Sequence, residues 1–306
     1  MHGMWIFVWA LSAIGATVLS GCGGGSHVDR DEASHAPLAA RDEPTGPAAS
    51  TAEIFRDVTA EMGIDFIHRT GDHEQTYFMP RIVGSGAAFF DADGDGLLDI
   101  YLLQNDGPDS EHSNQLYLGT ASGFVNATAE SGLGLPGYGM GVASGDVNND
   151  GKPDVLLNEY GSVRLLLNDS EQAAPSFADI TSAAGLENAL WGTSTCMVDY
   201  DRDGWLDLVL INYVNYDPSR WCADERSQQD FCGPDAFVGR VTKLYRNESA
   251  EGEVRFRDVT VRAGLGDHPG PGLGVFCADF NADRWPDIFI ANDGKANHLW
   301  INQQDG

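Results

Sequence analysis

Short apolar runs separated by turn residues recur along the chain from Ile54 onward. Runs such as 100–103, 208–211 and 288–290 are bounded by Gly, Asn or Asp. No helical spacing of apolar residues is sustained over the length of an ordinary helix. The pattern therefore predicts an all-β fold built from short strands.

These strands form a repeated unit. A small-residue strand such as 84–90 or 139–143 leads into an acidic loop, an apolar run and a second apolar strand. A Phe-x-Asp-Val-Thr-like strand and turn precedes each loop. About four strands per ~50 residues is typical of a propeller blade, and one blade must stack on its neighbours to bury its faces. The segment from residue 53 to residue 306 is long enough for about five blades.

The acidic loop is nine residues long, and its four copies start 55, 53 and 80 residues apart. Positions 1, 3, 5 and 9 carry side-chain oxygens, and position 7 offers a backbone carbonyl. The expected side-chain ligands are Asp91, Asp93, Asp95, Asp99, Asp146, Asn148, Asp150, Asp154, Asp199, Asp201, Asp203, Asp207, Asp279, Asn281, Asp283 and Asp287. The expected carbonyl ligands are those of Leu97, Lys152, Trp205 and Trp285.

Hard oxygen ligands in a flexible loop favour Ca²⁺ over Mg²⁺, which keeps its waters and a stricter octahedron. Clustered aspartates also repel one another without a cation. An EF-hand is excluded, because its position 12 needs Glu and the loops have Leu102, Leu157, Leu210 and Ile290 there. Gly at position 6 permits the tight turn, but Arg284 replaces it in the fourth loop. We therefore expect three to four Ca²⁺ ions.

The composition and the N-terminus indicate the compartment and exclude one class of partner. A net charge of -28 repels phosphate backbones, so nucleic acid is not an expected partner. Residues 5–19 form an apolar stretch of signal-peptide length that runs into Leu19-Ser-Gly-Cys22. We expect a signal peptide over 1–22, a flexible linker over 23–52 and propeller repeats over 53–306.

The stretch before Cys22 resembles a bacterial lipobox, which implies lipid on the Cys22 thiol. The expected product is an exported lipoprotein, periplasmic or at the cell surface, that touches the membrane only through this anchor. An ordinary signal peptide with a chance cysteine is the alternative, and it makes the protein secreted.

The repeats resemble FG-GAP (VCBS-type) repeats of integrin-α-type β-propellers. They are most similar to bacterial relatives of cartilage acidic protein, which often carry a C-terminal ASPIC/UnbV domain. The similarity lies in Phe66-Ile-His68-x-x-Gly71, in 84–91, and in the insert with 212–217 and 231–234. It implies a seven-bladed propeller with calcium on its loops and no settled activity. Since about five blades fit and no ASPIC/UnbV region follows, the chain is expected to be C-terminally incomplete.

The remaining cysteines and histidines offer a possible disulfide, two buried thiols and one candidate site residue. Cys222 and Cys232 share the insert that lengthens the third interval, so we expect a local disulfide. Cys196 and Cys277 lie three and two residues before their loops, so they should face opposite sides of their strands as buried thiols. His68 is a candidate site residue, but the sequence has no His metal spacing and no nucleophile elbow.

Three functions remain open from the sequence. The leading hypothesis is a calcium-binding module for a protein or glycan ligand at the cell surface, with no catalytic residues. The alternative is an extracytoplasmic enzyme, such as a polysaccharide lyase or hydrolase, which uses the propeller channel or a further C-terminal domain. A purely structural fragment is the third.

Overall fold

The computed structural model describes residues 54–71, 77–171, 174–250 and 252–305. The chain divides into Met1–Phe55 and Arg56–Gly306, and the second unit holds every strand described. The expected signal peptide, linker and Cys22 lie outside the described residues. In the described part of the chain, no helix is long and apolar enough to cross a membrane. Its helical turns are α1 (Thr128–Ser131), η1 (Met79–Arg81), η2 (Pro234–Ala236) and η3 (Leu265–Asp267).

Four antiparallel sheets follow one another along the chain. Sheet 1 contains β1 (Ala87–Phe90), β2 (Asp99–Leu102), β4 (Gln115–Thr120) and β5 (Gly123–Asn126). Sheet 2 contains β3 (Asn105–Gly107), β6 (Gly137–Gly145), β7 (Asp154–Glu159), β8 (Ser162–Asn168) and β9 (Phe177–Asp179). Sheet 3 contains β10 (Gly192–Val198), β11 (Asp207–Asn212), β14 (Lys243–Asn247) and β15 (Phe256–Asp258). Sheet 4 contains β16 (Gly272–Ala278), β17 (Asp287–Asn292) and β18 (His298–Trp300).

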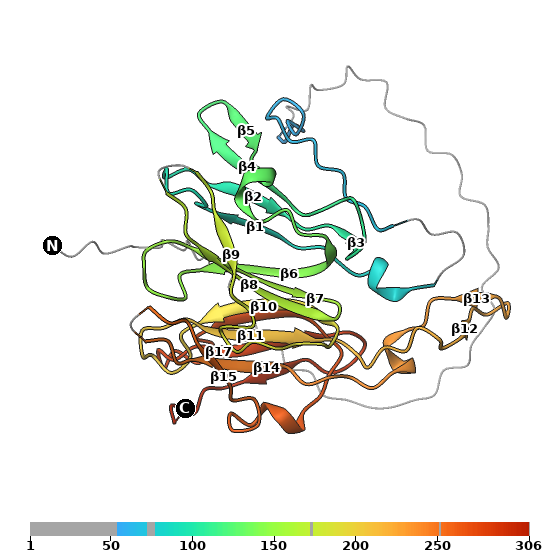
Figure 1. The fold of residues 1–306 in the computed structure, drawn as a ribbon. Coiled ribbons are helices and arrows are strands. Elements are labelled where there is room, and N and C mark those ends of the chain that lie inside the picture. The colour runs from blue at the N-terminus through green and yellow to red at the C-terminus, as the bar shows by residue number, and fades with distance from the viewer. Residues whose placement is uncertain (1–53, 72–76, 172–173, 251, 306) are drawn as a thin grey trace, which may run out of the picture. The chain divides into compact units, whose positions relative to one another are not determined.

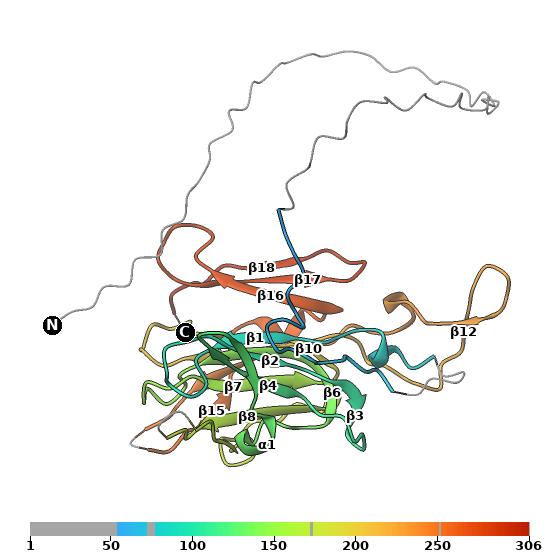
Figure 2. The ribbon, with the colours of Figure 1, turned by 90° about the horizontal axis from the view of Figure 1, so that it is seen from above.

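Consecutive sheets pack face to face, as Figure 1 shows for sheets 1 to 3 and Figure 2 for sheet 4. Alternate residues of one strand serve two interfaces, because side chains on a strand alternate between its faces. In β11, Leu208 and Leu210 pack in the core shared with sheet 2, while Val209 and Ile211 pack in the core shared with sheet 4. Each residue of β11 is buried. The all-β, propeller-type fold expected from the sequence is confirmed.

The estimate of about five blades is not confirmed, because the described residues form four propeller-type sheets. Two stretches account for the difference. Residues 54–71 form no strand, and the insert between β11 and β14 contributes only the short ladder of β12 (Cys222–Ala223) and β13 (Gln229–Asp230). An average length per blade cannot detect residues that enter no sheet.

The Phe-x-Asp-Val-Thr segments precede the acidic loops in the sequence, and the structure shows to which sheets they belong. The second, third and fourth copies lie in β5, β9 and β15, the outermost strands of sheets 1, 2 and 3. Each therefore ends the sheet before the next acidic loop. The first copy, 55–59, forms no strand. A linear repeat shows the order of its parts but not where one sheet ends.

The insert packs on an aromatic cluster at the end of β11 that is remote from the acidic loop. Trp191 stacks edge-on against Tyr213 and Tyr216, with ring centroids 4.9 and 5.2 Å apart. The Tyr216 hydroxyl accepts a hydrogen bond of 3.2 Å from the amide of Met79. The cluster therefore joins η1 to the insert. Cys222 and Cys232 form a disulfide with an S–S distance of 2.07 Å, which links the pair that the sequence analysis had selected.

Candidate metal centre

Each acidic loop joins two neighbouring strands of a sheet and is organised around its first aspartate; the strand pairs are β1 and β2, β6 and β7, β10 and β11, and β16 and β17. In the first loop, Asp91 Oδ1 accepts a hydrogen bond of 3.1 Å from the Asp95 amide, and Oδ2 accepts one of 2.9 Å from Gly96. The other loops repeat both bonds from positions 5 and 6, to Asp146, Asp199 and Asp279. The four loops thus share one backbone path.

Positions 3 and 5 continue this framework. The side-chain oxygen at position 3 accepts from the amide of position 5, at 3.2 Å in Asp93 and 2.9 Å in Asn281. The carboxylate at position 5 accepts from the amide of position 7, as Asp203 does from Trp205 at 3.0 Å. One oxygen of each side chain is thus held by the backbone, and a carboxylate retains its second oxygen for an ion.

Residues in the left-handed backbone conformation produce the tight turn of each loop. Position 6 has a positive φ in all four loops, from 74° at Arg284 to 92° at Gly204. Arg284 was expected either to adopt a left-handed conformation or to distort the fourth loop, and it adopts the left-handed conformation with the loop's hydrogen bonds intact. Position 4 is left-handed as well, including Asn149 at 58° and Arg202 at 60°, which the sequence analysis did not foresee.

The ninth residue anchors the loop to the sheet. The Asp207 carboxylate is fully buried and accepts two hydrogen bonds, of 3.0 Å from the Tyr200 backbone amide and of 2.8 Å from the Asn247 backbone amide. Asp99, Asp154 and Asp287 make the equivalent pairs of bonds. Burial raises the pKa of Asp154 and of Asp207 to about 7. These carboxylates lack the hydration that would stabilise their charge.

Carboxylates converge in the first and third loops. One oxygen from each of Asp91, Asp93 and Asp99 lies within 4.8 Å of the others, and the same holds for Asp199, Asp201 and Asp207. Burial raises the pKa of Asp93 and of Asp201, and the neighbouring carboxylates add to the rise. This set of hard oxygens at short mutual distance fits Ca²⁺, which neutralises the charge that burial and repulsion penalise.

The second and fourth loops carry asparagine at position 3. The side-chain amide of Asn148 donates a hydrogen bond of 3.0 Å to the Asp150 carboxylate, and that of Asn281 donates one of 2.9 Å to Asp283. An amide oxygen is still a calcium ligand, but it carries no charge. These loops therefore offer the same oxygen geometry with one negative charge less.

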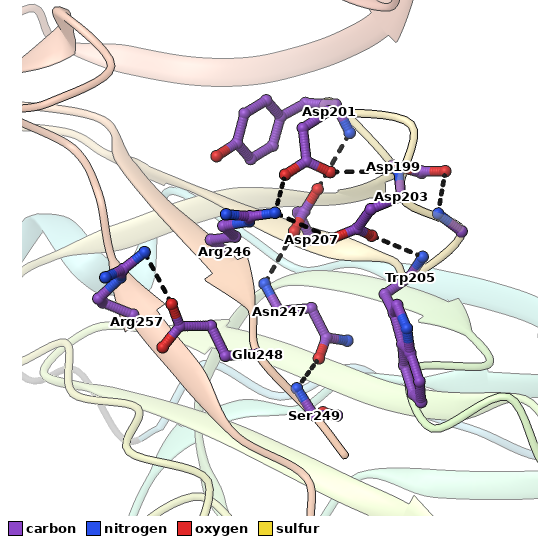
Figure 3. A network of polar contacts seen from close by, with 12 residues as sticks. Asp199, Asp201, Asp203, Trp205, Asp207, Arg246, Asn247, Glu248, Ser249 and Arg257 are labelled. Carbon is purple, nitrogen blue, oxygen red and sulfur yellow. Dashed lines mark hydrogen bonds and ion pairs between the residues drawn. The ribbon is translucent and has the colours of Figure 1, made fainter. Parts of the chain in front are cut away.

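A positively charged side chain, that of Arg246, contacts the third loop, and the sequence analysis missed this contact. Arg246 in β14 lies 2.7 Å from Asp201 and 3.1 Å from Asp203, through its Nη2 (Figure 3). The residue that precedes the amide partner of position 9 is Leu118, Leu167 or Ile301 in the other sheets. Arg246 lies far from its loop in the sequence, so spacing gave no signal for this contact.

The loops also contact one another. The Asn149 side chain donates 3.1 Å to the Gly204 carbonyl, from the second loop to the third. The Arg202 guanidinium lies 5.4 Å from the centre of the Trp285 ring, from the third loop to the fourth. Position 4 of one loop thus reaches position 6 or 7 of the next, and the second, third and fourth loops form a row along one side of the stacked sheets.

His68 lies apart from the loops. Its Nε2 is 2.9 Å from the Ser85 hydroxyl, and burial lowers its pKa. It borders an open hollow of about 500 Å³ that is also lined by Arg69, Asp106 and His112. Among the residues that the structure describes, no carboxylate forms a hydrogen bond or ion pair with His68 or Ser85 that would orient the pair as a nucleophile and its base.

These observations define an all-β repeat protein of the propeller type with one acidic loop per sheet. The profile of the FG-GAP-like repeat matches residues 91–157 and 146–210, each match running from one acidic loop through the next. Residues 91–210 therefore carry FG-GAP-like repeats.

Cartilage acidic protein 1 from Xenopus tropicalis is similar to this chain, with 27% identity over 223 residues. This alignment covers 69% of the chain and 30% of that protein. The mouse protein of the same name is 26% identical over 231 residues, which cover 71% of the chain and 31% of the relative. The chain thus spans about a third of the length of these relatives.

Proposed function

We propose that the protein is an exported, calcium-stabilised propeller module that binds a protein or glycan ligand at the cell surface. The observation that carries the proposal is the repetition of one hydrogen-bond framework in four loops, together with the convergence of three carboxylates in the first and third loops. A loop selected only as a turn has no reason to retain an oxygen at positions 1, 3, 5 and 9 in every copy.

The oxygens that would hold each ion are those of positions 1, 3, 5 and 9, together with the carbonyl of position 7. In the first loop these belong to Asp91, Asp93, Asp95, Asp99 and Leu97. Backbone amides already hydrogen-bond to each of these side chains, so little ordering remains when the ion binds. Binding to the native state alone adds about 2.7 kcal/mol per ion to the free energy of unfolding at a hundredfold excess over Kd.

The ligand-binding face is the end of the sheets opposite the loops. The insert leaves β11 at this end, is braced by its disulfide and exposes 60% of Trp221. A rigid loop with an exposed tryptophan suits recognition of a protein or a sugar, because an aromatic ring offers contact area at a low entropic cost. The loop end is devoted to calcium. FG-GAP-like repeats and the similarity to cartilage acidic protein 1 support a non-catalytic module.

Calcium titration calorimetry and thermal unfolding test this proposal. We expect three to four ions per chain and a clear fall in Tm on addition of EGTA, restored by Ca²⁺ and not by equimolar Mg²⁺. An unchanged melting curve with EGTA would refute the calcium assignment. A screen of glycans and surface proteins, run with calcium and repeated with Trp221→Ala, then tests the ligand-binding face.

A further inference from the structure

Two cysteines of neighbouring sheets occupy positions that differ by one residue. In β10, Val198 pairs with the ninth loop residue Asp207, and in β16, Ala278 pairs with Asp287. Cys196 lies two residues before Val198, whereas Cys277 lies one residue before Ala278. Because side chains alternate along a strand, this difference places the cysteines on opposite faces of their own sheets.

Opposite faces meet when sheets stack, so the offset brings the cysteines together. The face of sheet 3 that bears Val209 and Ile211 shares a core with the face of sheet 4 that bears Ile288 and Ile290. Cys196 and Cys277 both pack against this core, one from each side. The two thiols lie close enough to interact, because the contact with Cys277 lowers the pKa of the Cys196 thiol.

The neighbouring interfaces show what the fold requires at these positions. The pair that corresponds to Cys196 and Cys277 is Ala88 and Ser144 between sheets 1 and 2. Between sheets 2 and 3 it is Ala143 and Met197. Alanine and serine thus satisfy the packing, and a pair of sulfur atoms is found only at the third interface of the described sheets.

We propose that Cys196 and Cys277 are a redox site that forms a disulfide between sheets 3 and 4. The two thiols lose two electrons and two protons as the S–S bond forms. A small-molecule or protein disulfide accepts them by thiol–disulfide exchange and leaves as two thiols. Both residues are partly exposed in the structure. The insert already contains one disulfide, between Cys222 and Cys232.

The bond would tie together two sheets that are otherwise joined by packing and hydrogen bonds. One of these bonds runs from the Thr193 hydroxyl to the Gly272 carbonyl, at 2.7 Å. A cross-link between distant residues restricts the unfolded chain, and the effect grows with the length of the closed loop. Oxidation should therefore stabilise the stacked pair without changing its packing.

Peptide mass spectrometry on the full chain tests the proposal. The protein is equilibrated with oxidised or reduced glutathione in the presence of calcium, alkylated and digested. We expect a cross-linked peptide containing Cys196 and Cys277 in the oxidised sample and two alkylated thiols in the reduced one. Two alkylated thiols after oxidation, or separate glutathione adducts with no cross-link, would overturn the proposal.

Cys196→Ala and Cys277→Ser are matched variants, because they introduce residues that the fold uses at the corresponding positions. Either variant should lose the cross-linked peptide while keeping its calcium content. Oxidised glutathione should raise the Tm of the wild-type protein more than that of the variants, whose residual shift reports on Cys222 and Cys232. Equal shifts in all three proteins would contradict a stabilising bond between the sheets.

Discussion

The side-chain amide of Asn247 donates a hydrogen bond of 2.9 Å to the backbone carbonyl of Val147, 100 residues earlier in the chain. It also donates a hydrogen bond of 2.9 Å to the carbonyl of Leu206, in the acidic loop of its own sheet. Val147 is the second residue of the preceding acidic loop, so Asn247 joins two loops. Asn168 makes the same two hydrogen bonds, to the carbonyls of Ala92 and Pro153. Asn302 makes them to the carbonyls of Tyr200 and Pro286.

Asn247→Ala should lower the free energy of unfolding by about 2–4 kcal/mol. The substitution removes both bonds and leaves two carbonyl oxygens without a partner, at about 1–3 kcal/mol for each buried group. Urea unfolding in calcium measures the change. Asn126→Ala is the control. The side-chain oxygens of Asn247 and Asn126 both accept a hydrogen bond from the amide two residues on, but Asn126 is exposed. A control loss as large as that of Asn247→Ala would contradict the role of the inter-loop bonds.

The four acidic loops could be located from the sequence because their repeated side-chain oxygens lie within nine residues of one another. The asparagines after the second apolar strand were not recognised, since Asn168 and Asn247 look like ordinary turn residues. Asn168-Asp-Ser170 and Asn247-Glu-Ser249 even match glycosylation acceptors, but both asparagine side chains are buried and bonded. Their role depends on the neighbouring sheet, which local patterns cannot show.

For Cys196 and Cys277 the local pattern was informative, but the contact between them was not foreseen. The expectation that Cys196 and Cys277 face opposite sides of their strands follows from the alternation of side chains and agrees with the register of β10 and β16. Its consequence, that the thiols meet, requires the order in which the sheets stack. Strand register is a local property, whereas a contact between sheets is set by the tertiary structure.

Arg246→Leu should tighten calcium binding at the third loop by about tenfold or more. The guanidinium that contacts Asp201 and Asp203 must move or share its partners when an ion binds, and a cation a few ångströms away opposes the ion by more than ~1 kcal/mol. Leucine is the residue found at the corresponding position in sheets 1 and 2. Calorimetry would show one site with a lower Kd. Unchanged affinities at all sites would mean that Arg246 leaves the loop freely.

Stability without calcium should fall as the pH rises from about 4 to 7. Asp154 and Asp207 have a pKa of about 7 in the folded state, against about 3.9 in an unfolded chain. Between these values the folded protein binds protons that the unfolded chain has released, so raising the pH favours unfolding. Urea midpoints of chelator-treated protein measure the slope. Asp154→Asn should reduce it, and a slope of the opposite sign would show that the two carboxyls are ionised in the folded state.

Calcium should reverse this dependence, because the ion binds the ionised carboxylates. Lowering the pH below about 7 protonates Asp154 and Asp207 and should weaken the second and third sites before the others. Stability in excess calcium should therefore rise with pH over the same window. Parallel curves with and without calcium would contradict this competition.

Arg284→Gly should stabilise the protein and improve the fourth calcium site. Arg284 has a φ of 74°, a left-handed conformation that costs a residue with a side chain about 1–2 kcal/mol and glycine almost nothing. The reciprocal change is Gly204→Arg in the third loop, where φ is 92° and a Cβ would meet no atom within 4 Å. Its cost should thus be that of the backbone alone. Opposite shifts of similar size in urea unfolding, and in the Kd of the altered loop, are expected. If Gly204→Arg proves harmless, the left-handed position is not what distinguishes the fourth loop, and the missing charge at Asn281 is the difference left to test.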